Sequence, residues 1–283
     1  MESIGATDLH IPVIAEIGIN HNGDLKLAER MIREAKSAGC DFVKFQKRDI
    51  SIVYSQEVLD SPRESPWGTT QRDQKVGLEF DALQYEAIAN ICAEVGIGWT
   101  ASAWDLESLK FVENFSPPFH KVASAMIANR ELLVEVAKLG RPTLVSTGMC
   151  DWDDVDFAVD TLVAHEVPFG LFHTVSTYPM DESVANLRMI QSLKDRYGCP
   201  VGYSGHEASV SVSVFAVALG ATFVERHFTV DRTMYGSDQA ASLEPRGMRE
   251  LVSIVRKFPS TVGTGEKIWA PGEREVAAKL RYW

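Results

Sequence analysis

The chain has 283 residues, of which 45% are hydrophobic, a length that is long for one ordinary domain but normal for an α/β barrel. Its 28 Lys and Arg residues against 39 Asp and Glu residues give a net charge of −11 without any basic run, which makes nucleic acids and anionic membrane surfaces poor partners. No apolar run reaches the roughly 18 residues of a membrane span, no leader is recognisable, and the 4 cysteines form no Cys-x-x-Cys pair, so we expect a cytoplasmic protein with reduced thiols.

Short apolar runs alternate with segments of helical period along the chain. The first pair is the clearest: a strand is expected at Val13–Gly18, followed by an amphipathic helix with Asp24 as its N-cap and Gly39 as its stop. The other strands are expected at Phe42–Gln46, Ile97–Ser102, His120–Ala123, Thr143–Ser146, Phe169–His173, Val201–Ser204 and Phe223–His227. The other helices are expected at Asp81–Val95, Leu106–Phe115, Arg130–Leu139, Asp153–Ala164, Val184–Tyr197, Ala208–Leu219 and Arg246–Phe258.

Eight successive β-then-α units predict a single-domain (β/α)8 TIM barrel over residues 11–283, after an N-terminal extension, residues 1–10, of which Met1–Leu9 contributes little to the core. The alternative is a doubly wound α/β sheet, but no Gly-x-Gly-x-x-Gly or phosphate-binding loop follows any strand. One connection, residues 48–80, is longer than unstructured loops usually are. We interpret it as a lid or specificity loop over the barrel mouth, the alternative being a tolerated surface insertion.

Polar side chains are concentrated where the expected strands end. In a barrel these ends face the active site, so their concentration at one rim indicates an enzyme rather than a purely structural barrel. The residues are Glu16, Lys44, Gln46, Ser102, Lys121, Ser124, Ser146, His173, Ser176, Ser204, His206, Glu225 and His227.

Two histidines, His206 and His227, each follow an apolar run, with a helical segment between them. Parallel strands joined by a helix place their C-terminal ends side by side, so both imidazoles should lie within reach of one ion. Two imidazoles with Glu225 nearby suit a borderline divalent metal that keeps open coordination positions. The alternative is two unrelated histidines, one of them a hydrogen-bonded core residue.

Several motifs in combination resemble the sialic acid synthase family, whose members condense phosphoenolpyruvate with N-acetylmannosamine or a related aldose. The motifs are Ala15-Glu16-Ile17-Gly18-Ile19-Asn20-His21-Asn22-Gly23, Val43-Lys44-Phe45-Gln46, Ser146-Thr147-Gly148-Met149, Tyr178-Pro179, Glu225-Arg226-His227-Phe228-Thr229 and Gly236-Ser237-Asp238. The resemblance extends over about residues 11–275 and implies a (β/α)8 barrel. It also implies phosphoenolpyruvate and an aldose as substrates, a divalent metal (Mn²⁺, with Mg²⁺ or Co²⁺ as alternatives), and a homodimer.

The resemblance implies roles for individual residues. The predicted metal ligands are His206 and His227. The predicted catalytic side chains are Glu16, Lys44, Lys121 and Glu225, with the choice between the two glutamates for proton transfer left open. The predicted substrate-binding side chains are Gln46, Ser102, Ser124, Ser146, Ser176, Tyr178, Ser204 and Asp238. Both lysines and the serines fall where the family holds phosphoenolpyruvate, and Glu16, Gln46, Tyr178 and Asp238 fall where it contacts the sugar.

Two departures from the family pattern concern the sugar. Relatives have an acidic residue where this chain has Met126. Relatives also continue into a small antifreeze-like domain that supplies an arginine to the sugar's N-acyl group, and we expect no such domain here because the chain stops at Trp283. We therefore expect weak turnover of N-acetylmannosamine and efficient condensation with another aldose. Three arginines of the long connection are candidates to contact it, unless they are solvated surface charges: Arg48, Arg63 and Arg72.

Two other functions stay open. A lysine Schiff-base aldolase would use Lys44 or Lys121, but it gives no role to the histidine pair. A non-catalytic barrel that binds a sugar acid is the other, and it is motivated by Met126 and the missing domain.

Overall fold

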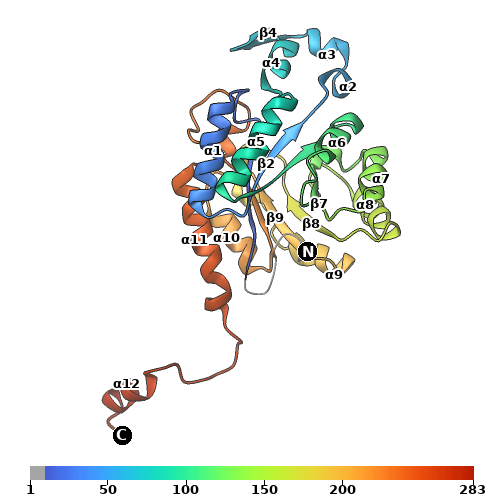
Figure 1. The fold of residues 1–283 in the computed structure, drawn as a ribbon. Coiled ribbons are helices and arrows are strands. Elements are labelled where there is room, and N and C mark those ends of the chain that lie inside the picture. Colours follow the sequence, from blue (N-terminus) through green and yellow to red (C-terminus); the bar gives the residue numbers. More distant parts are fainter. Residues whose placement is uncertain (1–9) are drawn as a thin grey trace.

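The computed structural model describes residues 10–283, in which eight parallel strands form a ring (Figure 1). The strands are β1 (Val13–Gly18), β2 (Phe42–Lys47), β5 (Gly98–Ala103), β6 (His120–Val122), β7 (Thr143–Ser146), β8 (Phe169–Thr174), β9 (Val201–Gly205) and β10 (Val224–His227). They neighbour one another in chain order, β10 returns to pair with β1, and every neighbouring pair is joined in the sheet except β5 and β6, which only lie side by side. Between β5 and β6 the Thr100 hydroxyl donates to the Phe119 carbonyl at 2.8 Å. The predicted barrel is confirmed, and the doubly wound alternative is wrong.

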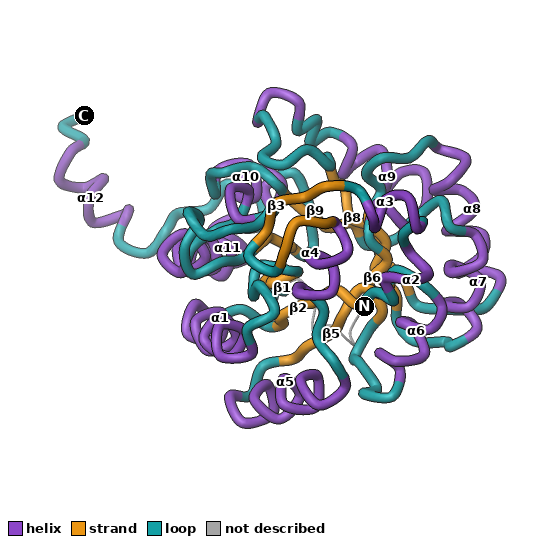
Figure 2. The backbone as a smooth tube through the Cα atoms, turned by 90° about the horizontal axis from the view of Figure 1, so that it is seen from above, coloured by secondary structure: helices purple, strands orange, loops and turns teal. Residues whose placement is uncertain are grey.

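Helices cover the outside of the ring (Figure 2). They are α1 (Leu25–Ala38), α5 (Ala82–Val95), α6 (Leu106–Glu113), α7 (Arg130–Lys138), α8 (Trp152–Ala164), α9 (Met189–Tyr197), α10 (Ser211–Ala218) and α11 (Pro245–Val262). Helix α1 has the predicted bounds because the Asp24 carboxylate accepts from the N–H groups of Lys26 and Leu27, and Gly39 adopts φ +91°. A separate apolar cluster fills the inside of the ring. Its members Ile14 and Leu144 lie two residues before Glu16 and Ser146 on the same strands, so they point to the same face and lie beneath them. The cluster consists of Ile14, Phe119, Leu144, Phe172 and Phe223.

Two helices begin later than the sequence pattern predicts. Helix α9 begins at Met189 rather than near residue 184, because Asn186 adopts φ +45°, which a right-handed helix cannot contain. Helix α10 begins at Ser211 rather than Ala208, and the carbonyls of Glu207 and Ser209 accept hydrogen bonds from the buried guanidinium of Arg226. Both shifts depend on local backbone conformation and tertiary contacts, which the spacing of apolar residues in the sequence does not reveal.

The long connection, residues 48–80, is not an unstructured loop but a compact insertion. It contains α2 (Ile50–Val53), α3 (Gln56–Asp60), the hairpin of β3 (Pro62–Ser65) and β4 (Gly68–Thr70), and α4 (Gln71–Leu78). Trp67 packs on Gly77, where any side chain would overlap its ring, and meets Tyr235 edge-on at 5.8 Å. Gln74 donates to the Tyr235 hydroxyl at 3.0 Å. These contacts hold the insertion across the mouth of the ring, as Figure 2 shows from above.

A buried ion pair ties the ends of β9 and β10 together. The guanidinium of Arg226 lies 2.9 Å from the Glu207 carboxylate, and both side chains have no exposed surface. Arg226 also donates to the Gly205 carbonyl at 3.1 Å, and the Tyr203 hydroxyl donates to Glu207 at 2.9 Å. Because Glu207 follows His206 and Arg226 precedes His227, this pair fixes the backbone that carries both histidines.

A second ion pair, at the opposite end of the ring, joins the chain just before β2 to helix α11. Asp41, just before β2, accepts from Arg256 of α11 at 2.6 Å and from the Val13 N–H at 2.7 Å. His10 contacts the other oxygen of the same carboxylate at 2.9 Å. The seam between β10 and β1 is therefore held from outside by α11.

Helix α11, which ends at Val262, is the last helix packed on the ring. Residues 263–283 carry α12 (Glu273–Leu280) away from the ring and are almost entirely exposed, so they contribute no side chains to its core (Figure 1). The prediction for Met1–Leu9 lies outside the described residues. Among residues 10–283, none of the helices combines the length and the hydrophobicity needed to span a membrane.

Replacing Arg226 with methionine should lower the free energy of unfolding by about 3–5 kcal/mol, because it leaves the Glu207 carboxylate buried without its partner. Urea denaturation followed by circular dichroism measures the loss. The control is Arg72→Met, which removes a surface ion pair with Asp60 (2.8 Å) and should cost less than about 1 kcal/mol. Equal losses in the two variants would contradict the role given to the buried pair.

Candidate active site

A cavity of about 280 Å³ opens at the C-terminal rim of the ring. Strand ends form its floor, and the insertion and the connection between β10 and α11 form its wall. The lining residues with polar or charged side chains include Glu16, Lys44, Gln46, Arg48, Tyr54, Lys75, Trp104, Lys121, Ser124, Ser146, Thr174, Tyr178, Ser204, His206, Glu225, His227, Ser237 and Asp238. Four of these are Lys or Arg and three are Asp or Glu, so the cavity is locally cationic in a chain whose net charge is −11.

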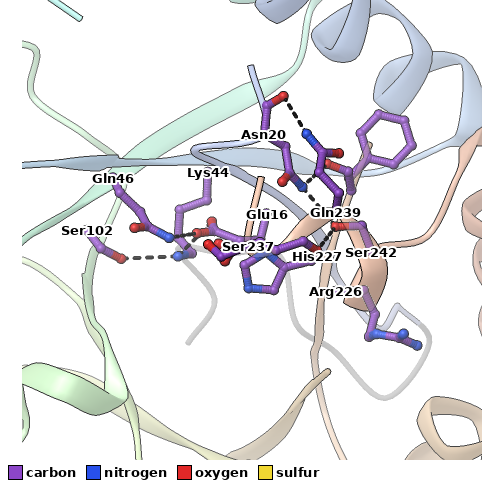
Figure 3. A network of polar contacts seen from close by, with 12 residues as sticks. Glu16, Asn20, Lys44, Gln46, Ser102, Arg226, His227, Ser237, Gln239 and Ser242 are labelled. Carbon is purple, nitrogen blue, oxygen red and sulfur yellow. Dashed lines mark hydrogen bonds and ion pairs between the residues drawn. The ribbon is translucent and has the colours of Figure 1, made fainter. Parts of the chain in front are cut away.

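On one side of the floor, Lys44 connects two glutamates. Its ammonium lies 2.7 Å from Glu16 and 3.8 Å from Glu225, and it donates to the Ser102 hydroxyl at 3.1 Å. Gln46 donates to the second oxygen of Glu16 at 2.9 Å (Figure 3). The β1–β2 register places Glu16 beside Lys44, so their pairing follows from the sheet itself.

On the other side, Lys121 of β6 donates to the Ser146 hydroxyl at 2.6 Å and lies 3.7 Å from Glu225. The Ser204 hydroxyl donates to the same Glu225 oxygen at 3.1 Å. Glu225 therefore lies between the two lysines, and the four buried charges balance one another when all are ionised.

Burial shifts the protonation of these groups in different directions. Burial, together with the neighbouring Glu225 charge, raises the pKa of Glu16 to about 7 despite Lys44. Burial also acts to raise the pKa of Glu225, but Lys121 and Lys44 outweigh it and hold that pKa below its usual range. Burial lowers the pKa of Lys121 to about 8. Glu16 is thus the carboxyl that can gain or lose a proton near neutral pH.

The rings of His206 and His227 lie beside each other at the rim, with centroids 5.3 Å apart. His206 Nδ1 contacts the Val175 carbonyl at 2.7 Å, which assigns the proton to Nδ1 and leaves the Nε2 lone pair available. His227 Nδ1 is buried without a hydrogen-bond partner and lies 3.8 Å from Asp238. Burial lowers the pKa of His206 to about 4, so its ring is neutral at pH 7, as a metal ligand must be. Tyr178 packs on His206 at 4.1 Å.

A small cradle of hydroxyl groups lies next to Lys121. The Gly148 N–H donates to the Ser124 hydroxyl at 3.2 Å. A side chain at Gly148 would overlap the hydroxyls of both Ser124 and Ser176, so only glycine leaves this space open. The Ser176 hydroxyl is buried without a partner.

The connection that carries Asp238 is held in place by buried amides (Figure 3). Asn20 donates to the Ser242 hydroxyl at 2.8 Å and to the Phe228 carbonyl at 3.0 Å. Gln239 donates to the Asn20 carbonyl at 3.1 Å, and Ser242 donates to the Asp238 carbonyl at 2.7 Å. These bonds fix Asp238 at the cavity edge.

The structure brings nearly all predicted site residues together. Twelve line the cavity: Glu16, Lys44, Gln46, Lys121, Ser124, Ser146, Tyr178, Ser204, His206, Glu225, His227 and Asp238. Ser102 lies behind Lys44, and Ser176 lies behind Gly148. His173 contacts the Ala185 carbonyl at 2.6 Å and is a buried structural residue. Met126 is buried in an apolar cluster and does not line the cavity.

Residues of the insertion were only partly anticipated. Of the three candidate arginines, Arg48 lines the cavity, whereas Arg63 does not and Arg72 is paired with Asp60 at the surface. Sequence reasoning missed several lining residues, among them Tyr54, Lys75 and Trp104. No local signal marks Tyr54 and Lys75, because their approach to the cavity depends on how the insertion folds, whereas Trp104 directly follows β5 and could have been found from its place at a strand end.

Comparison with known proteins supports the resemblance. The chain matches the NeuB family over residues 31–267. It is 40% identical over 271 residues to the N-acetylneuraminate-9-phosphate synthase of Mus musculus, covering 95% of this chain and 76% of that protein. It is 33% identical over 280 residues to the N,N'-diacetyllegionaminic acid synthase of Legionella pneumophila, covering 95% and 78%.

The fold is also similar to that of a solved structure. The crystal structure of N-acetylneuraminic acid synthetase from Leptospira borgpetersenii, in complex with citrate, matches with a TM-score of 0.84 and 31% identity over 98% of this chain and 94% of that one. The family match extends over most of the barrel, and the similarity to the synthases covers nearly all of this chain. The chain therefore belongs to the NeuB family.

Proposed function

We propose that this enzyme condenses phosphoenolpyruvate with an aldose to give a nonulosonic or related 2-keto-3-deoxy sugar acid and phosphate. The observation that carries the proposal is the pair of buried lysines, Lys44 and Lys121, on the floor of a cationic cavity beside the histidine pair. Relatives named as N-acetylneuraminate-9-phosphate, legionaminic acid and pseudaminic acid synthases support this reaction class.

Phosphoenolpyruvate fits the Lys121 side of the floor. A phosphate and a carboxylate need cations and N–H or O–H donors, and this side offers Lys121, Ser124, Ser146 and the Gly148 N–H. Lys44 provides the cation on the other side of the cavity floor. Because Glu16 and Glu225 already balance the two lysines, a trianionic substrate needs further compensation, which protonation of Glu16 and a bound cation would supply.

The donor set fits a divalent metal held by His206 and His227. Burial lowers the pKa of both imidazoles, which favours their neutral forms, and one nitrogen of His227 has no hydrogen-bond partner. Among residues 10–283, no group of three or more His, Cys, Asp and Glu side chains is arranged to hold a metal, so the ion would keep positions open for substrate. Mn²⁺ is the expected metal, with Mg²⁺ or Co²⁺ as alternatives. When bound, it would polarise the aldehyde oxygen of the acceptor.

The reaction joins the enol carbon of phosphoenolpyruvate to the aldehyde carbon of the open-chain sugar. The aldehyde oxygen gains a proton, which Glu16 is placed to donate because it neighbours His227 across the β1–β10 register. Water adds to the oxocarbenium carbon, and phosphate leaves by C–O cleavage, giving the keto acid. Lys44 and Lys121 hold the carboxylate and phosphate through these steps, and Glu225 stays ionised between them.

A Schiff-base aldolase is the second candidate, because the pKa of Lys121 is lowered to about 8. Such a lysine must lose its proton to attack a carbonyl. Lys44 is held as an ammonium by Glu16, and the histidine pair would have no function. Borohydride trapping with pyruvate would modify a lysine only if this candidate is correct.

We also propose that the enzyme acts in the cytoplasm as a homodimer. Four unpaired cysteines, Cys40, Cys92, Cys150 and Cys199, support a reducing compartment. Residues 263–283 expose several large apolar side chains, including Ile268, Leu280 and Trp283, and a second subunit could cover them. Light scattering measures the oligomeric state.

Phosphate release is the direct test of the reaction. Purified protein with phosphoenolpyruvate and Mn²⁺ should release phosphate only when an aldose is added, in a panel of hexosamines, hexoses, pentoses and their phosphates. Release without any aldose, or no release with any, would overturn the proposal. The control is the variant Lys138→Gln, which removes a surface ion pair with Glu135 (2.6 Å) and should release phosphate at the wild-type rate.

Replacing either His206 or His227 with alanine should weaken Mn²⁺ binding by at least about 10-fold, since each removes one of two proposed ligands. Calorimetric titration with Mn²⁺ measures this without turnover. His165→Ala, an exposed histidine on the outside of the barrel, is the matched control. Wild-type affinity in the double variant would rule out this metal site.

The value of kcat/KM for phosphoenolpyruvate should fall as pH rises through about 8. Lys121 is an ammonium below its lowered pKa and a neutral amine above it, and only the ammonium attracts the anionic substrate. Lys121→Arg should move this decline to higher pH, because a guanidinium stays charged. An unchanged decline in the variant would assign it to another group.

A further inference from the structure

The loop between β1 and α1, residues 19–24, carries the sequence Asn20-His21-Asn22-Gly23, to which the condensation chemistry gives no task. Ile19 lines the cavity, but the four residues that follow it do not. Asn20 and His21 are nevertheless buried. Buried polar residues that lie behind the cavity lining indicate that this β1–α1 loop acts on the segments that form the cavity wall.

His21 contacts the last residue of the insertion. Its ring stacks on Phe80, with the centroids 4.0 Å apart and the planes inclined by 18°. Burial lowers the pKa of His21 to about 3, so the ring is neutral and packs as an aromatic group. Its Nδ1 accepts from the Gly23 N–H at 3.1 Å, which ties the ring to the turn that follows it. His21 therefore joins the end of the insertion to the conformation of the loop.

Gly23 lies directly against helix α4 of the insertion. Its φ of +68° favours glycine, and a Cβ at this position would overlap the Gly77 carbonyl oxygen. That oxygen belongs to the backbone of α4, so a side chain at Gly23 could be accommodated only if the helix moved. Gly77 is itself covered by the Trp67 ring. The last turn of α4 thus packs closely on the loop because both contacting residues lack a side chain.

The other residues of the β1–α1 loop contact the connection between β10 and α11. Asn20 donates to the Ser242 hydroxyl at 2.8 Å (Figure 3), and Asn22 donates to the Tyr235 carbonyl at 2.9 Å. The hydroxyl of the same Tyr235 accepts from Gln74 of the insertion at 3.0 Å. The loop, the connection and the insertion therefore each contact the other two, and the loop reaches both walls of the cavity.

A movement of α4 would change the cavity wall. Lys75 lies two residues before Gly77 in this helix and lines the cavity. Its ammonium lies over the ring of Tyr54, a second lining residue, at 5.1 Å. Both side chains would therefore shift if α4 no longer packed on the loop. The lysines on the floor, Lys44 and Lys121, project from strands of the ring and do not depend on α4.

We propose that His21 and Gly23 are positioning residues, which hold the insertion where Tyr54 and Lys75 line the cavity. Neither of them lines the cavity, so both act through the packing of α4 and Phe80. The kinetic consequence rests on the proposed condensation: an aldose is enclosed by the insertion, whereas the proposed contacts of phosphoenolpyruvate lie on the floor.

Hydrogen exchange measured by mass spectrometry tests the packing of the insertion without substrate, metal or turnover. In Gly23→Ala, amides of residues 50–78 should exchange at least about 10-fold faster than in wild type, because the added methyl group displaces α4. The matched control is Gly140→Ala, whose φ is +67° and where a Cβ would meet no atom of residues 10–283 within 4 Å. It introduces a similar backbone strain without the contact, so exchange in residues 50–78 should stay at the wild-type rate.

Variants of His21 keep the test open if Gly23→Ala does not fold. His21→Phe keeps the ring that stacks on Phe80, and exchange in residues 50–78 should stay within about 3-fold of wild type. His21→Asn keeps a hydrogen-bond acceptor but removes the ring, and exchange there should rise as in Gly23→Ala. Equal exchange in the two His21 variants would overturn the role of the ring. Unchanged exchange in Gly23→Ala, or the same acceleration in Gly140→Ala or in strands β7 and β8, would overturn the proposal.

Steady-state kinetics adds a second readout that a general loss of stability would not give. Gly23→Ala should raise KM for the aldose by about 10-fold and leave KM for phosphoenolpyruvate within about 2-fold of wild type. Equal increases in both KM values would contradict the positioning role. Failure of the proposed reaction would show separately, as absence of phosphate release by the wild-type protein, and would leave the exchange measurements as they are.

Discussion

Two lysines and two glutamates lie buried on the floor of the cavity, and none of the four could be ionised there alone. Lys44 contacts Glu16 at 2.7 Å, and Glu225 lies within 3.8 Å of both lysines. The arrangement is neutral as a whole, so it keeps the strand ends together without any ligand. An anionic substrate adds negative charge to this neutral group. Glu16, whose pKa is already about 7, can offset that charge by binding a proton.

The two halves of the site are built on different parts of the fold. Lys121, Ser146 and Ser204 project from strands whose positions the ring determines. Arg48 and Lys75 belong to an insertion that contacts the end of β2 through the ion pair of Glu79 with Lys47 and contacts Tyr235 of the β10–α11 connection through Gln74. Replacing the insertion would change the outer wall without moving a strand. Barrel enzymes commonly vary specificity in this way, because loops carry the substrate contacts and strands carry the scaffold.

The strands and the floor of the site could be predicted from sequence because each polar residue directly follows an apolar run. His206 and His227 are examples, since one period of strand and helix separates them. Residues whose position depends on tertiary contacts could not be predicted. Lys75 reaches the cavity only because the insertion folds back, and Arg226 is an ordinary charged residue in sequence although it is fully buried. The late start of α9 likewise depends on the left-handed backbone of Asn186.

The ion pair between Asp41 and Arg256 bears on how the chain folds during its synthesis. It joins residues 215 positions apart, and it supports the seam at which β10 pairs with β1. During synthesis β1 lacks its partner on one edge until β10 has been made, and the seam gains its outer support only when α11 follows. Glu16 and His227 face each other across that seam. The site is therefore completed late in synthesis, and a chain truncated just before α11 would keep every lining residue but lose this support for the seam.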